Sequence, residues 1–236
     1  MSEFEPPRWP HVLTMGWHDL AFLHWALEPK QLERMIPPGL HLETFNGKAW
    51  IGLVPFRMSA VRPRGFPRWK WITDFPEMNV RTYVTDGKVS GVWFFSLDAT
   101  QPIAVWAARK GFHLPYFNAS IALQWAQDWH YYSCIRTEGR ESREFAGRYR
   151  PTGAPTLSLP GTLEHFLSER YWLFSSSPKG QNYRARIHHV PWPLQPAEVE
   201  IQRCSYMEPY GVTSLVPDAV HFAREIFVDS WALEKV

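Results

Sequence analysis

The stretch from Glu77 to Leu97, EMNVRTYVTDGKVSGVWFFSL, contains two strand-like runs joined by Asp86-Gly87. Asp-Gly between β-branched and aromatic runs is the strongest short-range signal for a β-hairpin with a two-residue type I′ turn. Such a turn sets the register of both runs. It predicts the opposed pairs Thr85 and Lys88, Tyr83 and Ser90, Arg81 and Val92, Asn79 and Phe94, and Glu77 and Ser96.

The two faces of this predicted hairpin differ in composition. Side chains alternate across a strand. One face is an ordinary core face with Met78, Val80, Thr82, Val84, Val89, Gly91, Trp93 and Phe95. The other face is mixed and carries Glu77, Asn79, Arg81, Tyr83, Ser90, Val92, Phe94 and Ser96. A strand face in water usually reads as polar, so the apolar residues of the mixed face indicate that it is covered as well.

The polar side chains of the mixed face, Glu77, Asn79 and Arg81, are therefore predicted to look into a closed or partly closed space. An uncompensated buried charge is very costly, so ionised groups there must be paired or functional. A structural pair of Glu77 with Arg81, or a solvated sheet face, remains the alternative to a binding site, because structural ion pairs imitate sites.

The composition of the chain predicts one large β-rich domain spanning residues 1–236. The 236 residues include 16% aromatic residues and 21 prolines spread along the chain, which favours short strands separated by turns over long helices. The formal charge of +2 is too small to indicate a surface that follows nucleic-acid phosphates. We therefore expect no nucleic-acid partner.

The cysteines and the N-terminal segment bear on location and metal binding. Cys134 and Cys204 are the only cysteines and lack CxxC spacing, so we expect reduced packing residues rather than a disulfide or a zinc site. The first twelve residues, MSEFEPPRWPHV, lack the basic and apolar regions of a signal peptide. No apolar run approaches the roughly 20 residues that span a bilayer. The sequence predicts a soluble cytoplasmic protein with no membrane partner, no metal and no cofactor.

The pattern of apolar and turn-forming residues along the chain predicts many antiparallel strands and few helices. Helices are expected at residues 28–36, at 116–128, where Phe117, Ile121 and Trp125 recur every four residues, and at 162–170 with Thr162 as N-cap. A second type I′ hairpin is expected around Asn46-Gly47. Further strands are expected at residues 130–137, 140–150, 171–175, 182–190, 198–207 and 219–228. This pattern predicts a single β-rich α+β domain, a large antiparallel β-barrel with an interior cavity and two or three peripheral helices.

Several runs resemble the YqjF-like family of conserved bacterial proteins, which has no established activity. They are GWHDLAFLHWAL from Gly16, IPPGLHLETFNGKAWIGLVPF from Ile36, EMNVRTYV from Glu77, GVWFFSLDA from Gly91, AARKGFHLPYF from Ala107, SERYWLF from Ser168 and IHHVPWPL from Ile187. The resemblance covers nearly the whole chain. It implies the superfold of acetoacetate decarboxylase, a single-domain β-barrel with a cone-shaped interior cavity.

The resemblance to this superfold also indicates where chemistry would lie. Acetoacetate decarboxylase uses a catalytic lysine that forms a Schiff base, with a second lysine beside it that lowers its pKa. In the decarboxylase, those lysines follow a proline in a segment that resembles GFHLPYF of this chain. At the matching positions this chain has Tyr116 and Phe117. The nucleophile is thus absent from its expected place, and Lys110 is not assigned that role. Glu77, which follows Phe75-Pro76, resembles a pocket glutamate of the decarboxylase barrel.

Three further residues are candidates for the same cavity, each with an ordinary alternative. Arg109 could bind a carboxylate in bidentate fashion, or form a salt bridge to Glu77 or Glu169. Tyr116 could donate a hydrogen bond to a substrate carbonyl, or pack with its hydroxyl satisfied. Of two adjacent histidines, His189 could face inward as a general base.

The sequence predicts a protein that binds a small anionic or carbonyl-containing organic molecule inside its barrel. Asn79, Arg81, Arg109, Phe94 and His189 are the predicted binding residues. The alternative is an enzyme acting on a small keto or hydroxy acid in the same cavity, with Glu77 and Tyr116 as the acid and base. The sequence does not decide between catalysis and binding, and it leaves the oligomeric state open, with a homo-oligomer as one alternative.

Overall fold

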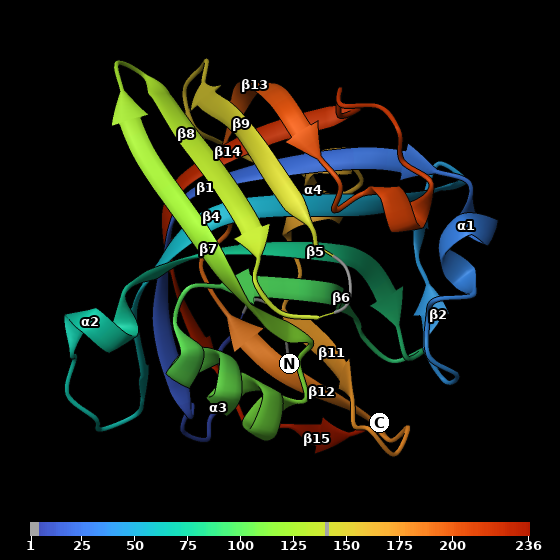
Figure 1. Ribbon diagram of the computed structural model, residues 1–236. Helices are drawn as coiled ribbons and strands as arrows, with labels where there is room; N and C mark the ends of the chain where they lie inside the picture. The colour runs from blue at the N-terminus through green and yellow to red at the C-terminus, as the bar shows by residue number, and fades with distance from the viewer. Residues whose placement is uncertain (1–4, 140–141) are drawn as a thin grey trace.

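The computed structural model describes residues 5–139 and 142–236 (Figure 1). Its strands are β1 (Leu13–Leu27), β2 (His41–Leu42), β3 (Thr44–Phe45), β4 (Lys48–Pro63), β5 (Phe75–Thr85), β6 (Ser90–Ala99), β7 (Tyr116–Ala126), β8 (Trp129–Arg136), β9 (Glu144–Pro151), β10 (Thr156–Leu157), β11 (Trp172–Ser176), β12 (Asn182–His188), β13 (Pro193–Cys204), β14 (Ala219–Ser230) and β15 (Glu234–Lys235). Its helices are α1 (Pro29–Glu33), α2 (Lys70–Thr73), α3 (Pro102–Phe112) and α4 (Leu163–Ser168), and a 3₁₀ turn spans Glu208–Tyr210. The predicted β-rich barrel with peripheral helices is confirmed.

The strands pair into one sheet that closes on itself twice. One ring, here called the nine-stranded ring, runs β14-β1-β4-β5-β6-β7-β8-β9-β13 and closes where β13 pairs with β14. A second ring, the seven-stranded ring, shares β14, β1, β4, β5 and β6 and closes through β11 and β12. The five shared strands therefore form a wall with one ring on each of its faces.

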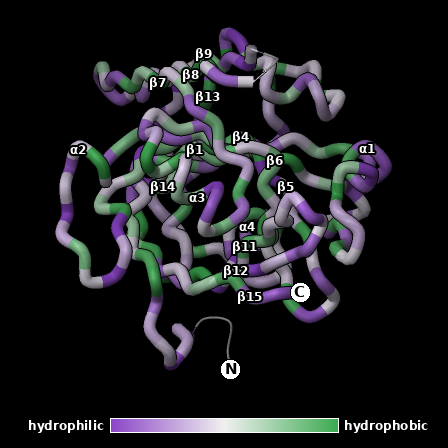
Figure 2. Tube along the Cα trace, turned by 60° about the horizontal axis from the view of Figure 1, so that its bottom comes forward, coloured by the Kyte–Doolittle hydropathy of each residue, from purple (hydrophilic) through white to green (hydrophobic). Residues whose placement is uncertain are grey.

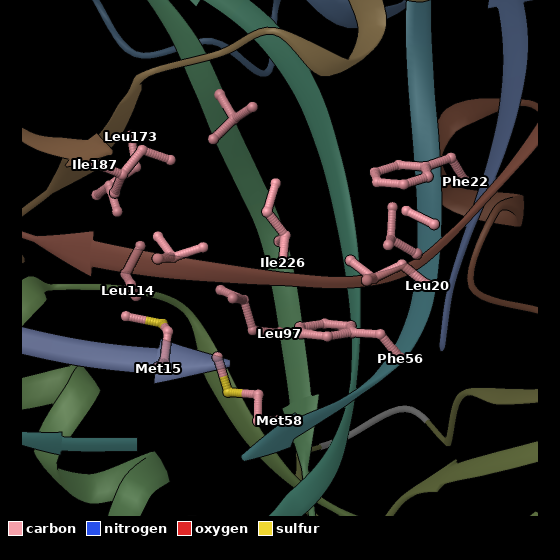
Figure 3. Packing of buried hydrophobic residues seen from close by; sticks show 14 of the residues in the cluster. Met15, Leu20, Phe22, Phe56, Met58, Leu97, Leu114, Leu173, Ile187 and Ile226 are labelled. Atoms are coloured by element: carbon pink, nitrogen blue, oxygen red, sulfur yellow. The ribbon is translucent and has the colours of Figure 1, made fainter. Parts of the chain in front are cut away.

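Each ring encloses its own hydrophobic core. The seven-stranded ring holds a core to which β5 contributes Tyr83. Strand β6 contributes Leu97, and β11 and β12 contribute Leu173 and Ile187 (Figure 3). The nine-stranded ring holds a second core built from other residues of the shared strands together with side chains of β7, β8 and β9. Hydrophilic residues gather outside these cores, for example along α1 (Figure 2).

The predicted faces of the hairpin from Glu77 to Leu97 are both buried, but its predicted turn is wrong. Thr85 pairs with Ser90, so the loop is two residues longer than a type I′ turn allows. Asp86 does not adopt the positive φ that such a turn needs, and its side chain instead accepts hydrogen bonds from the backbone N–H groups of Lys88 and Val89. Because the shift is two residues, each side chain near the loop stays on its predicted face.

A β-bulge further along β6 does change the faces. Arg81 pairs with Phe94 and Val80 pairs with Ser96, so Phe95 is the extra residue. Beyond the bulge, Ser96 leaves the face that was predicted for it. Leu97 takes its place opposite Asn79.

The predicted helix at residues 116–128 is wrong, because this segment is strand β7. A spacing of four residues between Phe117, Ile121 and Trp125 fits a helix, but it also places all three on one face of a strand. The structure has a helix just before it instead, α3, with Gln101 as N-cap and Pro102 in its first turn.

The other local predictions agree with the structure. The helix predicted at residues 28–36 is α1, and the helix predicted at 162–170 is α4, in which the Thr162 hydroxyl accepts a hydrogen bond from the backbone N–H of His165. Asn46 and Gly47 both have positive φ, as a type I′ turn requires. All six strands expected after residue 130 overlap observed strands, and Arg140 and Glu141 lie outside the described residues. Among the described residues, no helix is long and apolar enough to cross a membrane.

Gly91 should be essential for the contact between β6 and β11. A Cβ atom at this position would collide with the carbonyl oxygen of Trp172, whereas a Cβ at Gly111 of α3 would meet nothing within 4 Å. We expect Gly91→Ala to lower the free energy of unfolding by at least about 2 kcal/mol. Gly111→Ala should raise it by about 0.5–1 kcal/mol. Urea unfolding of both variants tests this, and equal effects would contradict the assigned packing of β6.

Candidate functional site

The inner wall of the seven-stranded ring carries the polar residues that the hairpin predicted. Glu77, Asn79 and Arg81 alternate along β5, and their side chains share a face with Tyr83 of the apolar core. All three are buried, with 1%, 5% and 8% of their surface exposed. Strand β4 on one side and β6 on the other hold β5 in place, so these polar groups lie on a strand that is paired along both edges.

Glu77 lies at the centre of a short hydrogen-bond network. The Tyr116 hydroxyl donates to Glu77 Oε2 at 2.8 Å, and the side chain of Asn79 also hydrogen-bonds to the carboxyl group. Burial raises the pKa of Glu77 to about 8, and the nearby charge of Asp98 acts in the same direction, while the two hydrogen bonds oppose them. Glu77 is therefore mostly protonated at neutral pH and can both donate and accept a proton.

Arg81 is a buried cation without a carboxylate partner. Among the described residues, no Asp or Glu oxygen lies within 4.0 Å of its guanidinium group. Its Nη2 donates one long bond of 3.4 Å to the carbonyl oxygen of Leu167, and its Nε has no hydrogen-bond partner. The guanidinium lies 5.2 Å from the centre of the Phe22 ring. Aromatic rings stabilise a cation, but they do not replace an anion.

His24 of β1 borders this space, although no sequence pattern predicts it there. The Tyr83 hydroxyl donates its single proton to the carbonyl oxygen of Leu167 at 2.8 Å, so His24 Nε2 must donate to the Tyr83 oxygen at 2.7 Å. Burial, with the charge of Arg81 as the second cause, holds the pKa of His24 well below its usual range. His24 is thus neutral, and its Nδ1 is an acceptor with no partner among the described residues.

Unpartnered polar atoms are concentrated around this inner wall. Buried groups without hydrogen bonds are uncommon in folded proteins, and each calls for an explanation. Among the described residues, the strands of the seven-stranded ring carry eight of them: Trp17 Nε1, His24 Nδ1, Trp50 Nε1, Asn79 Oδ1, Arg81 Nε, Trp172 Nε1, Ser175 Oγ and Asn182 Oδ1. The set includes donors and acceptors, as the recognition of a polar ligand requires.

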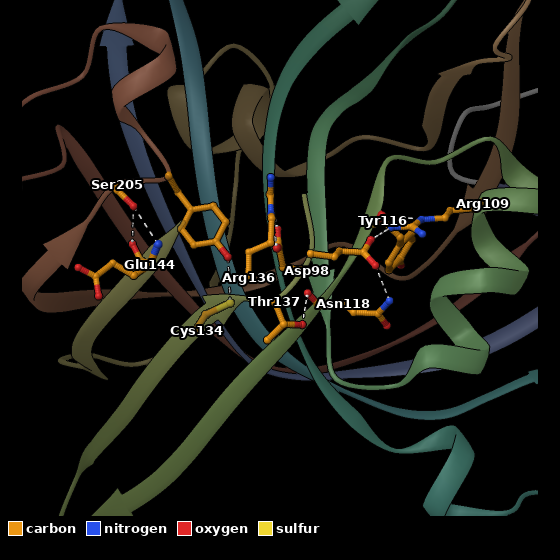
Figure 4. A network of polar contacts seen from close by, with 11 residues as sticks. Asp98, Arg109, Tyr116, Asn118, Cys134, Arg136, Thr137, Glu144 and Ser205 are labelled. Atoms are coloured by element: carbon orange, nitrogen blue, oxygen red, sulfur yellow. Dashed lines mark hydrogen bonds and ion pairs between the residues drawn. The ribbon is translucent and has the colours of Figure 1, made fainter. Parts of the chain in front are cut away.

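Arg109 does not join the inner wall. It lies near the end of α3 with 40% of its side chain exposed, donates from Nε to the carbonyl oxygen of Tyr116 at 2.7 Å, and pairs with Glu138 rather than with Glu77 or Glu169 (Figure 4). Its role is to fasten α3 to β7. Arg109 thus lies outside the Glu77 network, and its predicted contact with a ligand stays a prediction.

The remaining predicted residues, His189 and Phe94, make no hydrogen bond to Glu77. His189 is buried, stacks on Tyr171, and its two ring nitrogens lie 2.8 and 3.3 Å from the backbone carbonyl oxygens of Val190 and Arg170. Both ring nitrogens therefore lie beside backbone carbonyl groups, and the predicted contact of His189 with a ligand stays a prediction. Phe94 is half-buried and packs against the core of the seven-stranded ring opposite Arg81.

Two cavities open near β6. One, of about 330 Å³, is lined by Phe95, Phe117, Tyr206 and two arginines. The charge of Arg136 in this cavity is already neutralised by a bidentate ion pair with Asp98 at 2.7 and 2.8 Å (Figure 4). The other cavity, of about 280 Å³, lies between β6 and β11. An unsatisfied cation is found on the inner wall rather than in the larger cavity.

No lysine faces either core. All seven lysines of the chain are exposed: Lys30, Lys48, Lys70, Lys88, Lys110, Lys179 and Lys235. Lys110, the only lysine close in sequence to the expected position, lies on the outer surface of α3. Within the part of the chain that the structure describes, no lysine amine lines the barrel interior.

Comparisons with known proteins place the chain in a family. The model of the DUF2071 family, described as an uncharacterized conserved protein, matches residues 14–226. The uncharacterized protein YqjF of Bacillus subtilis (strain 168) is 37% identical over 225 residues, which are 95% of this chain and 92% of the relative.

Solved structures with the same fold are much more distant in sequence. An acetoacetate decarboxylase-like enzyme from Sphingomonas wittichii RW1 has a TM-score of 0.63 at 12% identity, covering 97% of this chain and 94% of that one. Acetoacetate decarboxylase from Legionella pneumophila has a TM-score of 0.65 at 13% identity, with coverage of 98% and 91%. The enduracididine biosynthesis enzyme MppR complexed with pyruvate has a TM-score of 0.60 at 8% identity, with coverage of 98% and 93%. These similarities show the fold.

Glu77→Gln should alter how stability depends on pH. The folded-state pKa of Glu77, about 8, lies above its ordinary value of 4.5, so the native protein holds a proton that the unfolded chain loses. The contribution of Glu77 to the free energy of unfolding is fully present below about pH 4.5. It is lost as the pH rises from there to about 8, by up to about 1.4 kcal/mol per pH unit. We expect urea unfolding to show wild type losing stability relative to Glu77→Gln across this window, since glutamine still accepts from Tyr116.

An exposed carboxylate provides the control for this measurement. Glu200 lies on the surface in an ion pair with Arg148. Glu200→Gln should therefore follow the pH dependence of wild type. Parallel curves for Glu77→Gln and wild type would refute a protonated Glu77 in the native state.

Proposed function

Because this chain belongs to the DUF2071 family, which is described as uncharacterized, we propose its function from its own side chains: it binds a small organic carboxylate inside the seven-stranded ring. Arg81 pairs with the carboxylate, and the protonated Glu77 together with Asn79 holds a second polar group such as a carbonyl or hydroxyl oxygen. The apolar core residues around them contact the rest of the ligand.

The observation that carries this proposal is the unpaired guanidinium of Arg81. Removing a charge from water costs several kcal/mol, and this cost is met only when a counter-charge with good geometry is supplied. Within the described residues, the protein supplies none to Arg81. A planar carboxylate matches the fork of guanidinium donors and would use the free Nε.

The comparison with a neighbouring fold supports the size and class of the ligand. The enduracididine biosynthesis enzyme MppR, which shares this fold, is complexed with pyruvate. Pyruvate carries a carboxylate for Arg81 and a carbonyl oxygen for the hydrogen-bond donors around Glu77. The absence of an interior lysine argues for noncovalent binding of such an acid in this chain.

Arg81→Met should abolish binding without weakening the fold. The variant removes an uncompensated charge, so its unfolding free energy should be equal to or above that of wild type. In thermal-shift measurements, wild type is screened against short keto acids, hydroxy acids and aromatic acids. An acid that binds should raise the midpoint of thermal unfolding through mass action. For the acid that does so, we expect at least about 100-fold weaker binding by Arg81→Met.

Arg170→Met is the matched control for this experiment. Arg170 is also 8% exposed and also contacts Tyr83, but it pairs with Glu43 at 2.6 Å. Its removal strands Glu43, so this variant should lose stability while keeping its response to the acid. A response that survives in Arg81→Met but disappears in Arg170→Met would show that the wrong guanidinium has been assigned.

A second candidate function is proton exchange on a bound keto acid, and the pair of Glu77 and Tyr116 favours it. A carboxyl group with a pKa of about 8 is suited to general acid–base catalysis. The Glu77 carboxylate would take a proton from the carbon beside the carbonyl group, while the Tyr116 hydroxyl donates a hydrogen bond to the enolate oxygen. Glu77 would then return the proton.

Exchange of the pyruvate methyl protons in D₂O, followed by NMR, tests this second function. The rate above that of buffer should rise with pH and level off above about 8, because the carboxylate is the active form. Glu77→Gln should reduce the rate to that of buffer, whereas Tyr116→Phe should lower it in part. An unchanged rate in Glu77→Gln would exclude Glu77 as the base.

A further inference from the structure

We propose that the opening between β6 and β11 is a portal through the barrel wall, through which a ligand reaches the inner face of the seven-stranded ring. The identity of that ligand rests on the proposed function, whereas the portal itself rests on three separate observations. These are the pairing of β6, the side chains around the 280 Å³ cavity, and an unpartnered hydroxyl inside it.

The first observation is a break in the pairing along one edge of β6. The opposite edge pairs with β5 from Ser90 to Ala99, interrupted only at the bulge. On the free edge, β11 pairs with Val92 and Trp93, and β7 pairs from Leu97 onward. In the described part of the chain, residues 94–96 have no strand partner on this edge. The break lies between the partner that continues the seven-stranded ring, β11, and the partner that continues the nine-stranded ring, β7.

The second observation is that both faces of the wall contribute to the cavity. Over an intact sheet, a surface cavity is lined by alternate residues of each strand, because neighbouring side chains point to opposite faces. Here consecutive residues contribute: Trp93 and Phe94 from β6, and Phe174 and Ser175 from β11. Trp93 and Phe174 belong to a cluster on the outside of the seven-stranded ring, whereas Phe94 packs on its inner core. The cavity therefore lies between the diverging strands rather than on top of them.

The third observation is the state of Ser175. This residue is 1% exposed, and its hydroxyl has no hydrogen-bond partner although it lines the cavity. It follows Phe174 in β11, so alternation directs it to the inner face, on the same side as Leu173 of the core. A polar group without a partner at the inner end of an apolar passage is suited to a brief contact with a passing polar ligand.

The portal leads toward the proposed site. Phe94, which separates the cavity from the core, pairs across the hairpin with Arg81, and Pro115 at the rim precedes Tyr116. The volume of 280 Å³ is far larger than the roughly 30 Å³ that a water molecule occupies in the liquid. A small carboxylic acid therefore fits the cavity, and Phe94 is the side chain that it must move to reach the inner face.

Thiol labelling tests the portal without any ligand. Ser175→Cys places a thiol at the inner end of the passage and removes no hydrogen bond. Ser230→Cys is the matched control, because Ser230 is 2% exposed but does not line the cavity. Methyl methanethiosulfonate should modify S175C at least about 100-fold faster than S230C, which reacts only through local opening of the fold. Peptide mapping by mass spectrometry separates these labels from those on Cys134 and Cys204.

The size of the reagent decides between a passage and unfolding. A polymer-linked maleimide should leave S175C unmodified, because it is too large for the passage. Equal rates for S175C and S230C, or equal labelling of S175C by the small and the bulky reagent, would overturn the portal. Labelling of S175C as expected, combined with no acid that stabilises wild type, would instead leave the portal intact and remove the proposed carboxylate site.

Discussion

The organisation of this protein depends on one constraint, which is that five strands serve two rings at once. Strands β14, β1, β4, β5 and β6 form a wall with a closed barrel on each face. Both faces of the central strands must therefore be apolar or internally satisfied, since neither meets water. This explains the long buried runs of β4 from Ala49 to Phe56 and of β5 from Glu77 to Val84. It also explains why a polar residue on β5 must be justified by a partner or by a ligand.

The features that could be predicted from the sequence are those set by short-range periodicity. Alternation along β5 was enough to bring Glu77, Asn79 and Arg81 together on one buried face, and Asn46-Gly47 was enough to mark a turn. A spacing of four residues fits both a helix and one face of a strand. In the segment after Tyr116 this spacing predicted a helix, whereas the segment is a strand. Element type was thus predictable only where the periodicity was unambiguous.

The rest of the site depends on contacts between distant parts of the chain. His24 and Leu167 reach Tyr83 from β1 and α4, and no local pattern announces either contact. The outward position of Arg109 follows from the way α3 packs on β7 and not from its spacing to Tyr116. Closure of the barrel also required the pairing of β13 with β14, which a strand list does not contain.

The fold of acetoacetate decarboxylase is retained here with a different interior chemistry. In place of an amine nucleophile, the inner wall offers a guanidinium, a protonated carboxyl group and an amide. In a buried environment, charge and hydrogen bonds are both stronger than in water. The interior therefore differs from one built around an amine nucleophile in the kind of polar groups that it carries.

The single extra residue at Phe95 determines which face of the sheet each following residue of β6 occupies. With it, Asp98 pairs with Met78 and reaches Arg136 on the far side of the wall. If one residue were deleted there, each side chain from Ser96 to Ala99 would exchange one barrel for the other. Asp98 would then face Glu77 across the hairpin, and two carboxyl groups would compete for one proton. The bulge therefore keeps the Asp98 carboxylate on the side of the nine-stranded ring and out of the seven-stranded ring. A deletion of one residue at this position would change the polar groups inside both rings.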